Sequence, residues 1–371
     1  MAIGRAPTSV KGRAMTAALS RRSLVSALQL AAAGVAVGGG FARSAAAQPS
    51  AESDGGAAAG RLPRVAADPA HVPPPIHRGH AVHHDITLEV KEVVAEIAPG
   101  TSFRFMTFGG QVPGPMIRVR VGDTVSLTLK ADPQALMPHN IDMHAIYGTG
   151  GGAAATLVGP GESKTETFRA AYPGAFIYHC AVPNFLDQHI SSGMFGMILV
   201  EPGAGLPAVD REFYLGQHEV YCDAAFGAQG FQDFDFSKMV AERPTYVLFN
   251  GAANGLTAAR YGAMRARVGE RVRVFLVCGG PNLISSFHPI GNVWSRAWPA
   301  GALTNPPLEY VQTQLVAPGS CFVGEMELPL AETITLVDHA LTRVVHQGLL
   351  AQIEVSGAAD PWLFHAGPAA R

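Results

Sequence analysis

Apolar and polar residues alternate along most of the chain between residues 85 and 355. The alternation is clear in residues 86–90 (ITLEV), and valine is frequent throughout. This pattern is typical of short β-strands with one buried face, and the 42 glycines and 27 prolines favour turns between them. Long helical periodicities are few. The pattern therefore predicts an all-β fold.

The strand-rich region consists of two blocks that repeat one another. VGDTV at 121–125 recurs as VGERV at 268–272, VGPG at 158–161 as VAPG at 316–319, and YHCA at 178–181 meets VDHA at 337–340. The spacing between partners drifts slowly, as loop insertions would cause. We therefore expect two tandem β-sandwiches of one type, at 83–203 and 208–356. An insertion at about 222–244 in the second sandwich is expected to contain a short helix at 236–242.

The ends of the chain are expected to lie outside the two sandwiches. Residues 1–47 contain SRRSLV at 20–25, a weakly apolar run to Phe41 and AAA at 45–47, which is typical of a twin-arginine signal peptide. This predicts export to the periplasm and no stable membrane span. Residues 48–82, rich in Ala, Pro and His, are predicted to form a flexible arm, and residues 357–371 a C-terminal tail.

The charge balance and the number of cysteines limit which partners and which disulfides the chain can have. With 27 basic and 29 acidic residues, the chain offers no sign of a nucleic-acid or polyanionic partner. Its four cysteines are too few for a disulfide framework. If Cys180 binds metal, at most one pair can form among Cys222, Cys278 and Cys321, and the sequence does not say which.

The strongest chemical signal is a set of soft donors in residues 176–200. Cys180, His189 and Met194 follow one another with C-x8-H-x4-M spacing, and His139 in the upstream stretch MPHN supplies a second imidazole. A Cys sulfur, two imidazoles and a weak axial Met are the donors of a blue-copper electron-transfer site. The combination is highly specific and predicts such a site.

A second metal site is expected behind the first. His179 precedes Cys180, and neighbouring residues of a strand point to opposite faces. By the same alternation His144, five residues after His139, faces away from the first site and shares its face with Asp142. The adjacent residues His179 and Cys180 would then provide a short covalent path for an electron between the two metals.

The second site needs a third imidazole, for which His339 is the natural choice. Three histidines and an open position are typical of a catalytic metal, and the link to a redox copper favours copper over zinc. Asp142 and His288 are the ionisable groups that could move protons there. Other interpretations stay open at this point: His288 as a hydrogen-bonded core histidine, and Asp142 as a turn or capping carboxylate.

These motifs carry a resemblance to a known family. The chain resembles the copper-containing nitrite reductases, two-domain cupredoxin proteins that form homotrimers. The resemblance covers roughly residues 85–355 and implies two Greek-key cupredoxin sandwiches. It rests on five stretches: FGGQVPGP at 108–115, MPHNIDMH at 137–144, residues 178–194, PNLISSFH at 281–288 and VDHAL at 337–341.

The resemblance implies a role for each site residue. The type 1 copper ligands would be His139, Cys180, His189 and Met194, and the type 2 ligands would be His144 and His179 together with His339 from a neighbouring subunit. Asp142 and His288 would form the proton-relay pair, and Ile290 would shape the substrate pocket. Pro289 departs from the family, where a small aliphatic residue is usual.

The implied reaction is the one-electron reduction of nitrite to nitric oxide, with about two coppers per subunit. The electron would come from a small redox protein, either a cupredoxin or a c-type cytochrome. One rival is a laccase-like multicopper oxidase, but the chain has no His-x-His motif and has Ala181 where such oxidases have a further histidine. The other rival is a non-catalytic copper shuttle, which would lack the set His144, His179 and His339.

Overall fold

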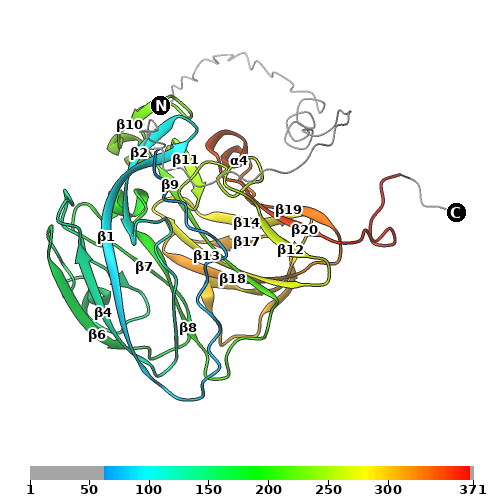
Figure 1. Cartoon of the computed structure of the whole chain (residues 1–371), viewed down its shortest axis with the longest axis horizontal. Coiled ribbons are helices and arrows are strands. Elements are labelled where there is room, and N and C mark those ends of the chain that lie inside the picture. The colour runs from blue at the N-terminus through cyan, green and yellow to red at the C-terminus, as the bar shows by residue number, and fades with distance from the viewer. Residues whose placement is uncertain (1–61, 368–371) are drawn as a thin grey trace, which may run out of the picture. The chain divides into compact units, whose positions relative to one another are not determined.

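The computed structural model describes residues 62–367, so the predicted signal peptide lies outside the described residues. The first sandwich appears in cyan and green in Figure 1. One sheet has the strand order β10-β2-β1-β4-β6, in which β10 (Gly230–Gln232) comes from later in the chain, and the other has the order β3-β8-β7-β5. The strands that belong to the first block of the sequence are β1 (His83–Ala98), β2 (Thr101–Phe108), β3 (Ile117–Arg120), β4 (Thr124–Ala131), β5 (Asp142–Met143), β6 (Ser163–Arg169), β7 (Gly174–His179) and β8 (Phe195–Glu201), with the short helices η1 (Thr149–Gly152) and α2 (Leu186–Ser191) between them.

The second sandwich appears in yellow and red in Figure 1. Its sheets have the orders β11-β9-β13-β18-β15-β16 and β12-β20-β19-β14-β17. Its elements are β9 (Arg211–Val220), β11 (Tyr246–Phe249), β12 (Met264–Arg267), β13 (Arg271–Gly280), β14 (Ser285–Ile290), β15 (Trp294–Trp298), η2 (Pro299–Gly301), β16 (Leu308–Val311), β17 (Gln314–Val316), β18 (Ser320–Glu327), β19 (Glu332–Asp338), α4 (Thr342–Gln347) and β20 (Ala351–Ser356).

The two sandwiches repeat the same strand pairings. The parallel pair β1–β4 of the first has its counterpart in the parallel pair β9–β13 of the second. The parallel pair β3–β8 likewise corresponds to β12–β20. The prediction of an all-β protein with two sandwiches of one type is therefore confirmed.

The insertion at 222–244 links the sandwiches. Its strand β10 (Gly230–Gln232) pairs in parallel with β2 of the first sandwich. It is followed by α3 (Phe236–Val240), so the predicted short helix is confirmed. The helix begins there because the Asp235 side chain accepts a hydrogen bond from the Lys238 backbone N–H, which satisfies one of the free donors of the first turn.

Residues 62–82, for which we expected a flexible arm, are packed onto the body of the protein. Val65 and Ala67 are buried. Val112 accepts a backbone hydrogen bond from Ala67 and donates one to Val65. Further along, Arg78 forms an ion pair with the buried Asp123. The flexible-arm prediction is therefore wrong for this part, because an extended Ala- and Pro-rich segment can still satisfy its backbone groups at a neighbouring loop.

The interface between the sandwiches contains apolar and charged groups. One apolar cluster includes Phe195 of β8 together with Tyr214 and Phe275 of the second sandwich. Beside it, the buried Arg118 of β3 bonds Glu212 of β9, with Nη1 and Oε2 2.5 Å apart. Removing water from these contacts makes the interface a continuous core and fixes the relative position of the sheets that hold the chemistry.

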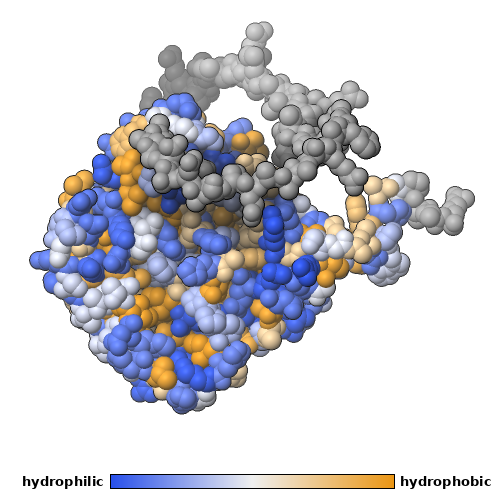
Figure 2. All heavy atoms as spheres, in the orientation of Figure 1, coloured by the Kyte–Doolittle hydropathy of each residue, from blue (hydrophilic) through white to orange (hydrophobic). Residues whose placement is uncertain are grey.

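Neither the surface in view nor the helices add a further structural feature to the two sandwiches. Figure 2 shows hydrophilic and hydrophobic residues interspersed over the face in view. Within residues 62–367, no helix combines the length and the apolar character that crossing a membrane requires. All four cysteines lie in this range as buried free thiols, so none of them is bridged.

Candidate metal centres

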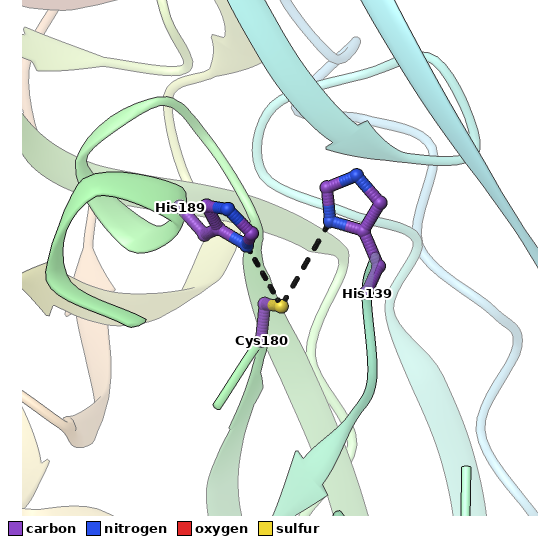
Figure 3. A group of neighbouring side chains, drawn as sticks. All are labelled: His139, Cys180 and His189. Carbon is purple, nitrogen blue, oxygen red and sulfur yellow. Dashed lines mark hydrogen bonds between the residues drawn. The ribbon is translucent and has the colours of Figure 1, made fainter. Parts of the chain in front are cut away.

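Three predicted ligands of the first site meet at the end of strand β7. The Sγ atom of Cys180 lies 3.2 Å from Nδ1 of His189 and 4.0 Å from Nδ1 of His139. Figure 3 shows both imidazole rings turned toward this sulfur. All three side chains are buried. A buried sulfur between two ring nitrogens is the donor set that suits copper in an electron-transfer site.

Backbone hydrogen bonds hold the segments that carry these ligands. His139 N–H donates to Val158 O and Val158 N–H donates back to His139 O, at 2.9 and 2.8 Å. Cys180 N–H donates to Met194 O, and Met194 N–H donates to His189 O. Met194 is also buried in the same apolar cluster as Cys180. The fold therefore brings the four predicted type 1 ligands together through contacts of its own.

The electrostatics of the first cluster suit a bound cation. Burial raises the pKa of the Cys180 thiol to about 11. Burial, followed by the nearby His139, lowers the pKa of His189 to about 3. The thiol is thus poorly able to ionise by itself in this site, whereas a copper ion would stabilise the thiolate and bind the neutral imidazoles. The residues present fit copper.

Two residues that sequence reasoning missed support this cluster. With Nδ1 of His139 facing the sulfur, its Nε2 faces Glu92 of β1, with Oε1 3.4 Å away. The side-chain carbonyl of Asn140 accepts a hydrogen bond from Ala181 N–H at 2.7 Å, which ties the His139 loop to the Cys180 strand. Such contacts orient ligands and raise their basicity. Asn140 lies inside the MPHN motif and could have been found there, whereas Glu92 is 47 residues from His139 and gives no local signal.

A second cluster lies on the other face of the same strands. His144 Nε2 is 3.1 Å from His179 Nε2. Asp142 offers a carboxylate oxygen within 4.8 Å of both ring nitrogens. The pairing of Asp142 with His179 between β5 and β7 sets this arrangement. Burial, with His179 as the second cause, lowers the pKa of His144, so the neutral, metal-binding form of the imidazole is favoured.

The two clusters are joined by the peptide bond between His179 and Cys180. The two side chains point to opposite sides, as strand alternation predicts. His139 and His144 also fall in different clusters, but only Asp142–Met143 of their segment has strand conformation. His139 is placed by its bridge to Val158 instead of by a continuous strand.

His288 and His339 lie together elsewhere in the chain. His288 lies within strand β14, His339 directly follows strand β19, and their ring centroids are 5.3 Å apart. They line one cavity together with Ser286, Gln312, Thr313 and Ala340. His339 is exposed. Within residues 62–367, the cluster of His144 and His179 includes Asp142 and no third histidine, so a single chain does not bring His339 to them.

The position of His339 depends on Asp338, a further residue that sequence reasoning missed. The buried carboxylate of Asp338 accepts hydrogen bonds from Ser286 N–H and Ala340 N–H, both at 3.0 Å. These bonds hold the turn on both sides of His339. Ile290, predicted to shape the substrate pocket, lies two residues beyond His288 on β14 and is partly exposed. The VDHA motif contained Asp338, but nothing in its pattern indicated this role.

Comparison with known proteins agrees with the metal chemistry. Residues 89–205 match a family model described as multicopper oxidase. The copper-containing nitrite reductase of Neisseria gonorrhoeae is 44% identical over 306 residues, which cover 81% of this chain and 76% of that protein. That of Alcaligenes xylosoxydans xylosoxydans is 33% identical, over 81% of this chain and 96% of that protein.

Solved structures agree. A copper nitrite reductase from Nitrosomonas europaea matches with a TM-score of 0.67 and 34% identity, over 75% of this chain and 96% of that chain. One from Thermus scotoductus matches with a TM-score of 0.64 and 28% identity, over 75% of this chain and 63% of that chain. On its sequence, its two-sandwich fold and its buried cluster of sulfur and imidazole donors, the chain belongs to the copper-containing nitrite reductases.

Proposed function

We propose that this protein reduces nitrite to nitric oxide with copper bound at both clusters. The reaction consumes nitrite, one electron and two protons, and yields nitric oxide and water. The observation that carries the proposal is the direct linkage of a soft Cys–His cluster to a two-histidine cluster through residues 179 and 180. An electron shuttle needs only the first cluster, so the second indicates catalysis.

The residues divide between the two coppers as follows. His139, Cys180, His189 and Met194 would hold the first, and His144 and His179 the second, together with the partner subunit's His339. Copper at the first cluster would accept the electron, and copper at the second would bind nitrite and deliver the electron to it.

The chain supplies the electron path and the protons. The His179–Cys180 peptide connects the clusters covalently, and His179 Nδ1–H donates to Cys180 O at 3.0 Å, which fixes the imidazole orientation. The Asp142 carboxylate stands beside both imidazoles of the second cluster, where it can hold a proton next to bound nitrite. His288, which accompanies His339, would reach the same site from the partner subunit.

An anaerobic assay tests the proposal directly. Copper-loaded protein receives a reduced dye and nitrite, and nitric oxide is read at an electrode. We expect continuous nitric oxide release from protein with about two coppers per subunit. Protein that holds both coppers and releases no nitric oxide would rule out the proposed reaction, and oxygen would then be tested as the alternative substrate.

Asp142→Asn is expected to keep the blue absorption and lower turnover about 100-fold, as loss of a general acid–base group commonly does. Asparagine keeps the shape of the side chain but carries no exchangeable acid proton. Turnover and copper content are measured together, with Asp187→Asn on helix α2 as the control. Unchanged turnover in the Asp142 variant would remove Asp142 from the reaction.

We also propose that the protein is a homotrimer in which His339 completes the second site of a neighbour. The separation of His339 from His144 and His179 within one chain, and its exposure, support this arrangement. His144→Ala and His339→Ala subunits are each expected to lose second-site copper when assembled alone.

Assembling the two variants together tests whether His339 acts in its own subunit or in a neighbouring one. When the subunits are unfolded and reassembled together, some sites combine an intact His144 with the partner subunit's intact His339, and activity returns. Preparations mixed without subunit exchange are the control and stay inactive. No recovery after verified exchange would show that His339 does not act between subunits.

The electron donor and the cellular location complete the proposal. A small cupredoxin or c-type cytochrome would deliver the electron near the first cluster. Phe185 supports this, because its partly exposed ring stacks on His189 with 6.1 Å between centroids and so brings the surface close to the metal ligands. Export to the periplasm rests on the twin-arginine motif at residues 20–25, which lies outside the described residues.

A further inference from the structure

Glu166 of strand β6 lies beside Asp142 under a glycine loop. A Cβ atom at Gly152 would lie 2.0 Å from Oε2 of Glu166, and a Cβ at Gly151 would lie 1.9 Å from Oδ1 of Asp142. Gly151 and Gly152 are consecutive residues, so two neighbouring glycines cover the two carboxylates. Glycine is needed at both positions, because a Cβ atom at either one would overlap a carboxylate oxygen.

A cavity of about 500 Å³ leads to Glu166 from the surface. Its wall includes Ile146, Tyr147, Thr149, Gly152 and Arg169. Glu166 Oε1 is buried and has no hydrogen-bond partner among residues 62–367. A buried carboxylate without partners is costly, whereas a carboxylic acid is not. The geometry therefore favours a protonated side chain between the cavity and Asp142.

The electrostatic environment of Glu166 also favours its protonated form. Burial, and then the charge of Asp142, raise the pKa of Glu166 to about 7. From β6 itself, Lys164 and Arg169 are exposed. The loop at residues 144–162 carries His144, Tyr147 and Glu162, and of these Tyr147 lines the cavity. The paired strand β4 faces Glu166 with three buried apolar side chains, Val125, Leu127 and Leu129. The side chain can thus gain and lose a proton near neutral pH.

We infer that Glu166 is a proton-relay residue that passes protons from this cavity to Asp142. The inference rests on the proposed reduction of nitrite. The O–H bond of the Glu166 carboxylic acid breaks, and the proton joins a carboxylate oxygen of Asp142, which has given its own proton to nitrite. Glu166 is then protonated again from solvent through the cavity, and the electron comes from the external donor. Glu166 acts through Asp142 and does not touch nitrite.

The test compares Glu166→Gln with wild type across the pH range. Below pH 7 we expect about tenfold lower turnover in the variant, because glutamine has the same shape but no acid proton. The ratio of the two rates falls toward one as the pH rises above about 7, since wild-type Glu166 is then ionised. Glu166→Asp, which retains a carboxyl group, recovers part of the turnover. Glu89→Gln, on strand β1 of the same sheet, is the matched control and keeps wild-type turnover.

A second readout needs no turnover. A protonated carboxyl group has an infrared carbonyl band that a carboxylate lacks. In the copper-loaded protein, one such band is expected below pH 7, absent from Glu166→Gln and lost from wild type as the pH rises through about 7. Blue absorption and copper content should be the same in both proteins.

The outcomes separate the two proposals. Wild-type protein that makes no nitric oxide overturns the proposed reaction and with it the relay. Wild-type protein that is active, with equal rates in Glu166→Gln at every pH, overturns the relay alone. A rate ratio that does not change with pH, or the absence of the infrared band, also contradicts it, because either result assigns Glu166 a merely structural role.

Discussion

Copper-loaded His144→Ala protein is expected to keep its blue absorption and to lose nitric oxide production completely. The substitution removes one of the two ring nitrogens that face each other at 3.1 Å in the second cluster. A single remaining imidazole from this chain holds copper poorly, and copper should fall from about two to about one per subunit. The first cluster is unaffected, since His144 belongs to neither its ligands nor their supporting contacts.

The variant should fold normally. His144 is partly shielded at its ring but keeps solvent exposure in the single chain and belongs to no apolar cluster, so its truncation opens no cavity in the core, and such changes usually cost little stability. Its backbone N–H, which donates to Ile177 O at 3.1 Å, is retained in alanine. His346→Ala, an exposed histidine of helix α4 outside both clusters, is the control and should be fully active. Nitric oxide production by His144→Ala protein at the wild-type rate would exclude the second cluster as the site of reduction.

Cys180→Ser should abolish both the blue absorption and nitrite turnover. Serine is close to cysteine in size, but its hydroxyl is a hard donor that does not replace the thiolate copper prefers here. Electron entry through the first cluster is lost, even though His144 and His179 keep their places. Visible absorption, copper per subunit and nitric oxide release are measured on the same preparation, and about one copper per subunit should remain.

Cys278→Ser is a matched control for this change. Cys278 is buried like Cys180, but it lies on strand β13, where its Sγ donates to Leu283 O at 3.7 Å. This variant should keep the blue absorption and turnover, so a loss seen only at position 180 reports metal binding and not burial of a hydroxyl. A Cys180→Ser protein that remains blue would show that the sulfur is not a copper ligand.

Much of the first site is decided by local sequence. Cys180, His189 and Met194 lie within one strand–helix–strand segment, and their backbone groups bond to one another. Because the contacts are local, the spacing of the residues is sufficient to predict that they meet. The opposite orientation of His179 and Cys180 also follows from the two-residue period of a strand. The repeat of the two sandwiches is visible for the same reason, since each copy has its own alternation.

Other features depend on how distant strands are placed. Glu92 of β1 lies 3.4 Å from His139, and Glu166 of β6 lies beneath Gly152, next to the glycine that covers Asp142. Neither pairing follows from spacing, because strand order and loop path decide which residues become neighbours across a sheet. The sequence indicated His339 as the third ligand and the resemblance implied that it comes from a neighbouring subunit, whereas only the fold shows that a single chain keeps it apart from His144 and His179.

Residues 62–82 show the same difference between what the sequence predicts and what the fold decides. Their composition is typical of an extended chain, as the structure shows, but composition does not tell whether such a chain is flexible or packed. Val65 and Ala67 are buried where the segment exchanges backbone hydrogen bonds with Val112. The sequence by itself thus determined the strands, the repeat and the local copper ligands. Only the tertiary structure decided the long-range partners, because these depend on the register of sheets and the packing of loops, which no local pattern records.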